Sequence, residues 1–588
     1  MSIFDVLALF GGLALFLFGM NVMGDGLTRA AGGKMERILE KLTSTPIKGV
    51  LLGAAVTAVI QSSSATTVMV VGFVNSGIMK LRQAVGIIMG ANIGTTVTSW
   101  ILSLSGIQGD SIWIQMLKPS SFSPILAVIG IAFLMFSKNE KKHDIGMIFL
   151  GFTILMYGMD AMSGAVAPLA DVPEFANALL MFSNPVLGMI VGTLFTAIIQ
   201  SSSASVGILQ ALCMTGAVTY GTALPIIMGQ NIGTCVTALL SSIGAKKNAK
   251  RAAFVHLYFN LIGTILFMIV FYSINAFVNF GVLQDMATPA GIAVIHSIFN
   301  ILTTIVLLPF GKGLEKLATL TIREKEEPVE EIAELVPLKH LDARFLEQPA
   351  FAVTQSMDVM NQMAGYSAEA LYDSLELMKD YSDEKWQRVE ALEDIVDKYE
   401  DELGTYLAKV SGKELAEEDS KRVSNGLHCI GDLERISDHA LAIAEIYAKM
   451  HKEEMVFSDK AMAELNLYSN AVYEIMSMTC KALNEDDMKI AKRIEPLEEV
   501  INGLNATIKK QHIKRLQKGK CTIELGIALE NLLNNYERVA DHCSNVAASL
   551  LQVKTDSFDM HEYLNRVKQE SNIEFQAMYS MYKEKYSL

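Results

Sequence analysis

Charged side chains are scarce in the first half of this 588-residue sequence. Residues 1–310 contain 15 Lys or Arg and 11 Asp or Glu, whereas the remaining 278 residues contain 34 basic and 52 acidic side chains. This division excludes a uniformly soluble globular protein, a collagen-like fibre and a disordered chain. The acidic balance of the second half argues against a nucleic acid as a partner. The sequence therefore predicts a membrane half joined to an acidic, soluble half.

The sequence predicts neither a disulfide framework nor a signal peptide. The six cysteines show no CxxC spacing, which predicts scattered reduced thiols. No basic residue precedes the first apolar run, which contains Asp5 and is too long for a signal-peptide core. Residues 3–23 are therefore expected to form a retained first membrane span.

Several apolar segments have the length needed to cross a bilayer. These lie near 3–23, 83–105, 144–166, 222–243, 252–276 and 289–310, with a shorter one near 122–137. Two further segments, 48–77 and 187–216, are interrupted at their centres by polar clusters. Each half has roughly 13 residues, about 20 Å of helix, which is short for a full crossing. We expect both segments to form re-entrant helical hairpins.

The membrane half is an internal duplication. Shifting the sequence by 139 residues aligns TAVIQSSSA (57–65) with TAIIQSSSA (196–204) at 8 of 9 positions. The same shift aligns AVGIIMGANIGTTVT (84–98) with ALPIIMGQNIGTCVT (223–237) at 11 of 15 positions. The predicted membrane domain, 1–310, consists of repeats 1–138 and 142–277 and an extra span at 289–310.

Basic residues predict that the two copies have opposite orientations. The loop at 28–48 contains five Lys or Arg, whereas its equivalent at 167–187 contains none. Under the positive-inside rule, equivalent loops then face opposite sides of the membrane. The predicted fold is all-α, a polytopic membrane protein with inverted-topology repeats and two re-entrant hairpins. Its N-terminus is expected outside and its C-terminal helical-bundle domain in the cytoplasm.

The interrupted hairpins are the strongest candidate for a binding site. Their polar clusters are Gln61, Ser62, Ser63 and Ser64, and Gln200, Ser201, Ser202 and Ser203. An inverted repeat with helices broken at mid-membrane is the usual construction of a secondary-transporter site. Serine clusters also allow close helix packing, but that alternative weakens when the cluster recurs in mirrored copies, each 31 residues before an Asn.

The chemistry of these clusters suits an oxyanion together with a hard monovalent cation such as sodium. No Arg or Lys lies in a mid-span segment, so a bound anion would be neutralised by helix dipoles and co-bound cations. Two H-x-x-x-N pairs, His256 with Asn260 and His296 with Asn300, each lie on one face of a predicted helix. Hydrogen bonding between helices is favoured for them over a proton or ion role.

These motifs resemble the type II sodium/phosphate cotransporters. Each QSSS cluster is followed by an I-I-M-G-x-N-I-G-T block, and FVHLYFN (254–260) is similar to that family's next segment. The resemblance covers most of 1–310 and implies that the two QSSS clusters form the phosphate and sodium site. It implies further ligands in the N-I-G-T segments, at Asn92, Thr95, Asn231 and Thr234.

The soluble half is predicted to be helical, because it has long amphipathic stretches, few Gly or Pro and no strand-like alternation. We expect a linker at 311–344 and a bundle at 345–588 with repeats near 345–450 and 455–555. The runs LERISDHALAIAE (433–445) and YERVADHCSNVAASL (536–550) resemble the PhoU family.

That resemblance implies metal binding by an E-x-x-x-D signature. It occurs at Glu393 and Asp397, Glu434 and Asp438, and Glu537 and Asp541, whereas Glu498 is followed by Asn502. Carboxylates four residues apart share one helix face, so two packed helices could hold a divalent or ferric metal. The alternative is an acidic, solvated surface.

The sequence thus predicts a sodium-coupled inorganic phosphate symporter of the cell membrane, with a cytoplasmic PhoU-like regulatory domain, and no enzymatic activity. Its expected partners are phosphate, sodium and the lipid bilayer. A homo-oligomer and cytoplasmic phosphate-signalling partners stay open. The alternatives are a phosphate sensor that does not transport and a transporter of another oxyanion or ion.

Overall fold

The computed structural model describes residues 2–31, 45–107, 111, 115–116, 118–137, 139–172, 174, 181–323, 332–554 and 573–588. The chain divides into two compact units, Met1–Pro328 and Val329–Leu588. Most of the basic residues predicted for the loop at 28–48 lie outside the described residues.

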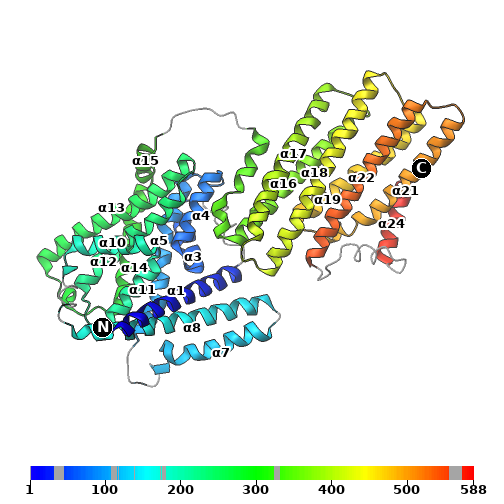
Figure 1. Cartoon of the computed structure of the whole chain (residues 1–588). Helices are drawn as coiled ribbons and strands as arrows, with labels where there is room; N and C mark the ends of the chain where they lie inside the picture. The colour runs from blue at the N-terminus through cyan, green and yellow to red at the C-terminus, as the bar shows by residue number, and fades with distance from the viewer. Residues whose placement is uncertain are drawn as a thin grey trace. The chain divides into compact units, whose positions relative to one another are not determined.

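Within the described residues of the first unit, seven helices are long and apolar enough to cross a membrane, as predicted. They are α1 (Ile3–Ala31), α5 (Leu81–Ser103), α7 (Pro119–Phe136), α8 (Glu140–Val166), α12 (Tyr220–Ser241), α13 (Lys247–Val278) and α14 (Pro289–Leu307) (Figure 1). Large apolar side chains are exposed along several of them, which is the pattern of a surface that faces lipid.

Both predicted hairpins are present. The first consists of α3 (Pro46–Ile60) and α4 (Ser63–Ser76), and the second of α10 (Pro185–Ile199) and α11 (Ser202–Cys213). Helix α3 runs parallel to α5, because Gly49 lies against Gly86 near both helix starts and Thr57 lies against Gly94 further along. Since α5 thus starts on the same side as α3, the intervening α4 must return to the side from which α3 entered. Helices α10 and α12 repeat the arrangement, which confirms the two re-entrant hairpins.

Glycine permits the close packing of α3 on α5 and of α10 on α12. A Cβ atom added at Gly90 would overlap the Val50 carbonyl oxygen, and one at Gly229 would overlap the Met189 carbonyl oxygen. These two glycines are equivalent under the 139-residue shift. The duplication has therefore kept the residue type that the backbone contact requires.

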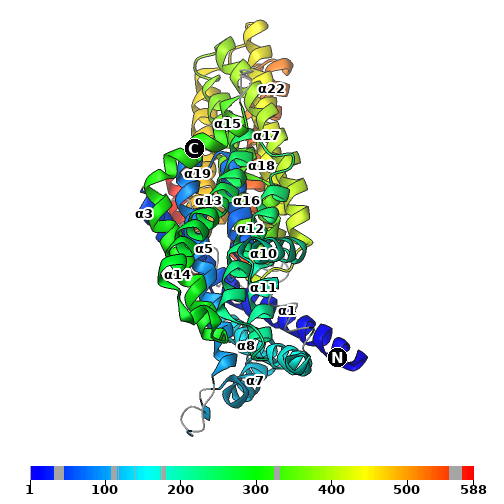
Figure 2. The ribbon, with the colours of Figure 1, turned by 90° about the vertical axis from the view of Figure 1, so that its left-hand side faces the viewer.

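The two copies are inverted with respect to each other. Helices α1 and α8 are equivalent and pack antiparallel, with Gly12 beside Met162 and Gly26 beside Ile148. Figure 2 shows α1 and α8 side by side, with α7 next to α8. The copies also interlock, because α4 packs on α12 and α11 packs on α5. The antiparallel pairing agrees with the inversion predicted from the basic residues.

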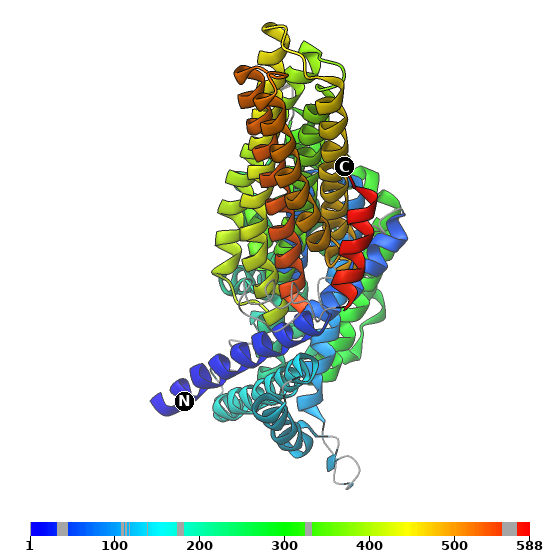
Figure 3. The same cartoon turned by 90° about the vertical axis from the view of Figure 1, so that its right-hand side faces the viewer.

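The second unit is a helical bundle made of two similar three-helix groups. These are α16 (Pro349–Glu376), α17 (Asp383–Ser411) and α18 (Glu417–Lys452), then α19 (Asp459–Glu485), α21 (Ile494–Gln517) and α22 (Ile523–Lys554). Helices α18 and α22 pack antiparallel at the centre, where Tyr447 and Tyr536 join their hydroxyls at 2.9 Å. Helix α24 (Ile573–Lys585) packs against α21 (Figure 3).

Ordered elements occupy both ends of the range predicted as a linker. Helix α15 (Gly311–Thr321) buries Leu314 and packs against α13 and α5 of the first unit. The segment Ala333–His340 packs against α17 of the second unit, where the Tyr399 hydroxyl donates to the Glu334 carbonyl at 2.7 Å. Both segments are short and mix apolar with charged residues, so their sequence pattern alone does not predict these contacts. Residues 324–331 lie outside the described range.

Candidate functional site

Each hairpin turns at a glutamine in a strained backbone conformation. Gln61 ends α3 and Gln200 ends α10, and both have φ of 59°, in the left-handed region. A non-glycine residue there costs on the order of 1 kcal/mol and is commonly found at functional sites. The recurrence of this turn in both copies favours a functional role for the two QSSS clusters over close helix packing alone.

The serine that follows each glutamine begins the returning helix. The Ser62 hydroxyl accepts a hydrogen bond from the Ala65 amide at 3.1 Å, and the Ser201 hydroxyl accepts one from the Ala204 amide at 3.2 Å. These bonds cap one amide at each helix start and leave the first-turn amides of Ser63 and Ser202 for another acceptor. Both residues are buried. An anion would therefore meet helix N-terminal N–H groups inside the protein.

Hydroxyl side chains that the sequence argument missed reinforce each tip. The Thr57 hydroxyl donates to the Thr66 hydroxyl at 3.0 Å, and the Thr196 hydroxyl donates to the Ser205 hydroxyl at 2.8 Å. The 139-residue shift aligns Thr57 with Thr196 and Thr66 with Ser205 in the sequence. Searching the alignment for conserved hydroxyls beyond the QSSS block would have found them.

The two tips differ in the partners of their glutamines. Gln61 is buried and its Oε1 accepts a hydrogen bond from the Thr98 hydroxyl at 3.0 Å, whereas Gln200 is exposed. Thr237, the equivalent of Thr98, donates instead to the half-buried Ser64 of the other copy at 3.3 Å. The structure thus brings the first cluster into contact with both copies and leaves Gln200 outside that contact.

The N-I-G-T residues are buried but mostly bonded within their own helices. The Asn92 amide donates to the Ile88 carbonyl, the Thr95 hydroxyl to the Ala91 carbonyl and the Thr234 hydroxyl to the Gln230 carbonyl, each at 3.0 Å. Asn231 differs, since its amide nitrogen donates to Asn300 on α14 at 3.1 Å. Their free lone pairs make all four oxygens available as further ligands.

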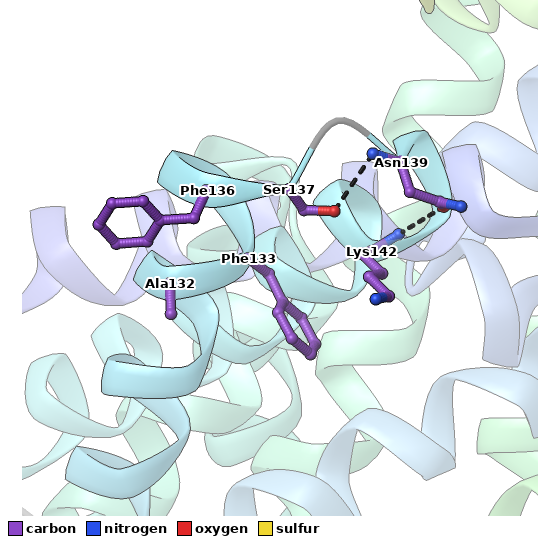
Figure 4. Close-up of a pocket in the computed structure, with 6 residues that line it drawn as sticks. All are labelled: Ala132, Phe133, Phe136, Ser137, Asn139 and Lys142. Carbon is purple, nitrogen blue, oxygen red and sulfur yellow. Dashed lines mark hydrogen bonds between the residues drawn. The ribbon is translucent and has the colours of Figure 1, made fainter.

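A separate pocket lies where α7 ends and α8 begins. It has a volume of about 560 Å³ and its lining includes Phe133, Phe136 and Lys142 (Figure 4). Asn139 caps α8 there by accepting from the Lys142 amide. None of the predicted site residues is among the described residues that line it, so it is distinct from the hairpin site.

In the soluble unit, the structure brings together three of the predicted metal-binding carboxylates. One oxygen each of Glu393 and Asp397 on α17 and of Asp438 on α18 lies within 4.8 Å of the other two. Burial raises the pKa of Glu393 to about 7, and the charges of Asp397 and Asp438 add to this effect. Burial and Asp438 also raise the pKa of the nearby Glu434. This carboxylate-only donor set fits a hard divalent or ferric ion.

The second predicted set is less concentrated. Glu537, Asp541 and Glu498 lie near the buried Tyr468, whose pKa is raised by burial and by these carboxylates. The Glu537 carboxylate accepts a hydrogen bond from the Asn505 amide, and Arg538 pairs with Asp541 at 3.6 Å. Within the described ranges, only the first set places three ligand oxygens close together.

Comparison with known proteins identifies both units. The Na+/Pi-cotransporter family description matches residues 15–164 and 172–285, and the PhoU domain description matches residues 360–447 and 465–550. An uncharacterized protein of Bacillus subtilis, YqeW, is 30% identical over 315 residues, which cover 53% of this chain and 97% of that protein. The chain belongs to the Na+/Pi-cotransporter family. It also carries a C-terminal PhoU domain, as predicted.

Two other relatives have names that state an activity. The candidate inorganic phosphate export protein YjbB of Salmonella typhimurium is 24% identical over 563 residues, covering 95% of this chain and 99% of that protein. The sodium-dependent phosphate transport protein 2A of Rattus norvegicus is 23% identical over 379 residues, covering 44% of this chain and 59% of that protein. The family thus places the chain among membrane proteins of phosphate transport.

Proposed function

We propose that the chain is a sodium-coupled inorganic phosphate symporter of the cell membrane. The observation that carries this proposal is the pair of strained Gln61 and Gln200 turns, each of which starts a buried helix inside an inverted repeat. Helix N-terminal amides and clustered hydroxyls suit a phosphate oxyanion, and hydroxyl and carbonyl oxygens suit sodium. The site residues are those of the two QSSS clusters and the two N-I-G-T segments.

Charge balance explains why phosphate would require sodium. Helices α4, α11 and α12 contain no Lys or Arg, and α5 contains only Arg82, in its first turn. Helix dipoles offer only partial positive charge to a phosphate anion. A co-bound sodium ion supplies the rest, and each ligand then raises the affinity for the other by the same factor.

Uptake into proteoliposomes tests this proposal. Purified full-length protein should take up radiolabelled phosphate when sodium is high outside, and should not do so when potassium replaces sodium. Binding without transport would identify a phosphate sensor. Transport of sulfate or another oxyanion in preference to phosphate would contradict the substrate assignment.

Phosphate export is a second candidate for the physiological direction. The Salmonella typhimurium relative, which this chain matches over nearly its whole length, is named for export. A symporter is reversible, so the gradients of sodium and phosphate decide the direction of net flux. Phosphate efflux from loaded proteoliposomes into sodium-free medium should therefore be measured beside uptake.

The PhoU-like domain is proposed to be cytoplasmic and to regulate transport through a bound metal. The ligands are Glu393, Asp397, Glu434 and Asp438, with Glu537 and Asp541 as a second set. Replacing Asp438 and Asp541 together by Ala should lower the metal content of the purified protein and alter regulation. Transport itself should survive, since the substrate site lies within residues 1–310. A correctly folded double variant without any transport would show that the domain does more than regulate.

A further inference from the structure

Helix α14 lies outside the duplication, yet it contacts both copies of the repeat. It packs antiparallel to α5 of the first copy, because Gly106, just after the end of α5, lies against Pro289 at the start of α14. In this contact His296 meets Ser99 and Ser297 meets Trp100. Helix α14 also contacts α12 of the second copy, through Asn231. The H-x-x-x-N pair of α14 is therefore placed where the two inverted copies meet.

A closed set of hydrogen bonds surrounds Asn231. The Asn231 Oδ1 atom lies 3.3 Å from His296 Nε2, and the Asn231 Nδ2 atom donates to Asn300 Oδ1 at 3.1 Å. Asn300 in turn donates to the His296 carbonyl at 2.9 Å, and His296 Nδ1 lies 2.7 Å from the Ser99 hydroxyl. All four side chains are at most 3% exposed.

The donor and acceptor roles in this set are mutually consistent. Asn231 Oδ1 can only accept, so His296 Nε2 must carry the proton. A neutral imidazole then accepts at Nδ1, where the Ser99 hydroxyl donates. Asn231 uses one of its two amide hydrogens and one lone pair of its oxygen in this way. One hydrogen and one lone pair remain for a ligand.

Neither the counterpart of Asn231 nor the other H-x-x-x-N pair has this arrangement among the described residues. Asn92, which is the first-copy counterpart of Asn231, donates to its own helix at Ile88. In the other H-x-x-x-N pair, Asn260 repeats the bond to the His256 carbonyl at 3.0 Å, but neither ring nitrogen of His256 has a hydrogen-bond partner among the described residues. Of the two H-x-x-x-N pairs, only that of α14 therefore bonds an N-I-G-T asparagine through its imidazole within the described residues.

We propose that His296 is a positioning residue that fixes the orientation of the Asn231 side chain in the transport site. The inference rests on the proposed phosphate symport and adds a residue from outside the duplication to it. His296 and Asn300 hold both ends of the Asn231 amide, so the plane of the amide and the positions of its remaining hydrogen and lone pair are fixed. Ser99 ties this orientation to the first copy through the imidazole.

Kinetics of phosphate uptake by full-length protein in proteoliposomes test the role of His296. His296→Leu should raise the apparent KM for phosphate roughly tenfold, the factor that corresponds to one buried hydrogen bond, and should change the maximal rate much less. His296→Gln should restore KM to within about threefold of wild type, because its amide N–H can replace Nε2–H. Ser297→Ala is the matched control. It removes the 3.0 Å bond from Trp100 between the same two helices and should leave KM unchanged.

A double-mutant cycle separates positioning from helix docking. His296→Leu should have little further effect in the Asn231→Ala background, because its effect runs through that side chain. The inference would be overturned if His296→Leu and Ser297→Ala had equal KM values. It would also be overturned if His296→Leu raised KM tenfold in the Asn231→Ala background.

Two further results keep the inference open to refutation. If His296→Leu fails to insert, Ser99→Ala, which removes only the hydroxyl that fixes the imidazole, carries the same comparison with Ser297→Ala. A higher KM for Ser99→Ala supports the inference, and an equal KM overturns it. Wild-type protein without phosphate uptake would overturn the proposed function, and this inference with it.

Discussion

Replacing Glu393 by Gln should stabilise the soluble unit when no metal is bound. In the folded protein, burial and the charges of Asp397 and Asp438 raise the pKa of the Glu393 carboxyl from 4.5 to about 7. The folded state then binds more protons than the unfolded state between these two pH values. The contribution of this carboxyl to the free energy of unfolding is therefore fully present below about pH 4.5 and is lost as the pH rises through 7.

The size of the effect follows from the pKa shift. A shift from 4.5 to about 7 corresponds to about 3 kcal/mol of unfavourable free energy for the charged form. Glu393 is only half-buried, so solvent screening reduces this to about 1 kcal/mol. Glu393→Gln should accordingly raise the melting temperature at pH 8 by about 2 °C. Acidification of the wild type from pH 8 to pH 6 should raise it by roughly 1 °C, because the carboxyl of the unfolded chain, with a pKa of 4.5, is still ionised at pH 6.

Thermal melts of residues 329–588, treated with chelator, measure this directly. Glu402→Gln, on the exposed surface of the same helix, is the control and should not change the melting temperature. Added Mn2+ should reverse the order of stability, because the wild type then gains binding free energy that Glu393→Gln loses. A wild-type melting temperature that stays constant from pH 6 to pH 8 and does not respond to Glu393→Gln would refute clustering of the carboxylates.

Three further predictions concern the membrane unit. Ser63→Ala or Ser202→Ala should reduce sodium-dependent phosphate uptake at least severalfold with normal membrane insertion, and wild-type uptake by either would contradict a site at both tips. Gly90→Ala should lower the free energy of unfolding of the detergent-purified protein by about 1–3 kcal/mol, because the added Cβ overlaps the α3 backbone. An unchanged free energy of unfolding would show that the close packing is dispensable. A single cysteine at Lys80 should react with an impermeant reagent only from the cytoplasm and one at Glu174 only from outside, whereas labelling of both from one side would rule out the proposed topology.

Much of the membrane fold is readable from the sequence because the duplication supplies two independent samples of each element. Under the 139-residue shift, α3 aligns with α10 and α5 aligns with α12. Their ends agree to within one residue. Hydropathy and the polar interruptions then suffice to predict the hairpins. The inversion follows from basic residues alone, and the antiparallel α1 and α8 agree with it.

The partners of individual side chains could not be predicted in this way. Identical QSSS clusters gave no indication that Gln61 is buried against Thr98 while Gln200 is exposed. The extra helix α14 breaks the symmetry, and its contact with Asn231 depends on packing between distant segments. The soluble unit shows the same limit. The E-x-x-x-D spacing places two carboxylates on one helix face, but which helices bring their pairs together is a property of the packed bundle.

Reversal of the sodium gradient is the most direct test of the central claim. Proteoliposomes are prepared with equal phosphate concentrations inside and outside, and the membrane potential is held at zero. They should accumulate phosphate when sodium is high outside and lose it when sodium is high inside. Net phosphate flux must change sign with the gradient if the two ligands move together through the site between the hairpins. A flux that ignores the direction of the sodium gradient, or no flux at all, would contradict sodium-coupled phosphate symport.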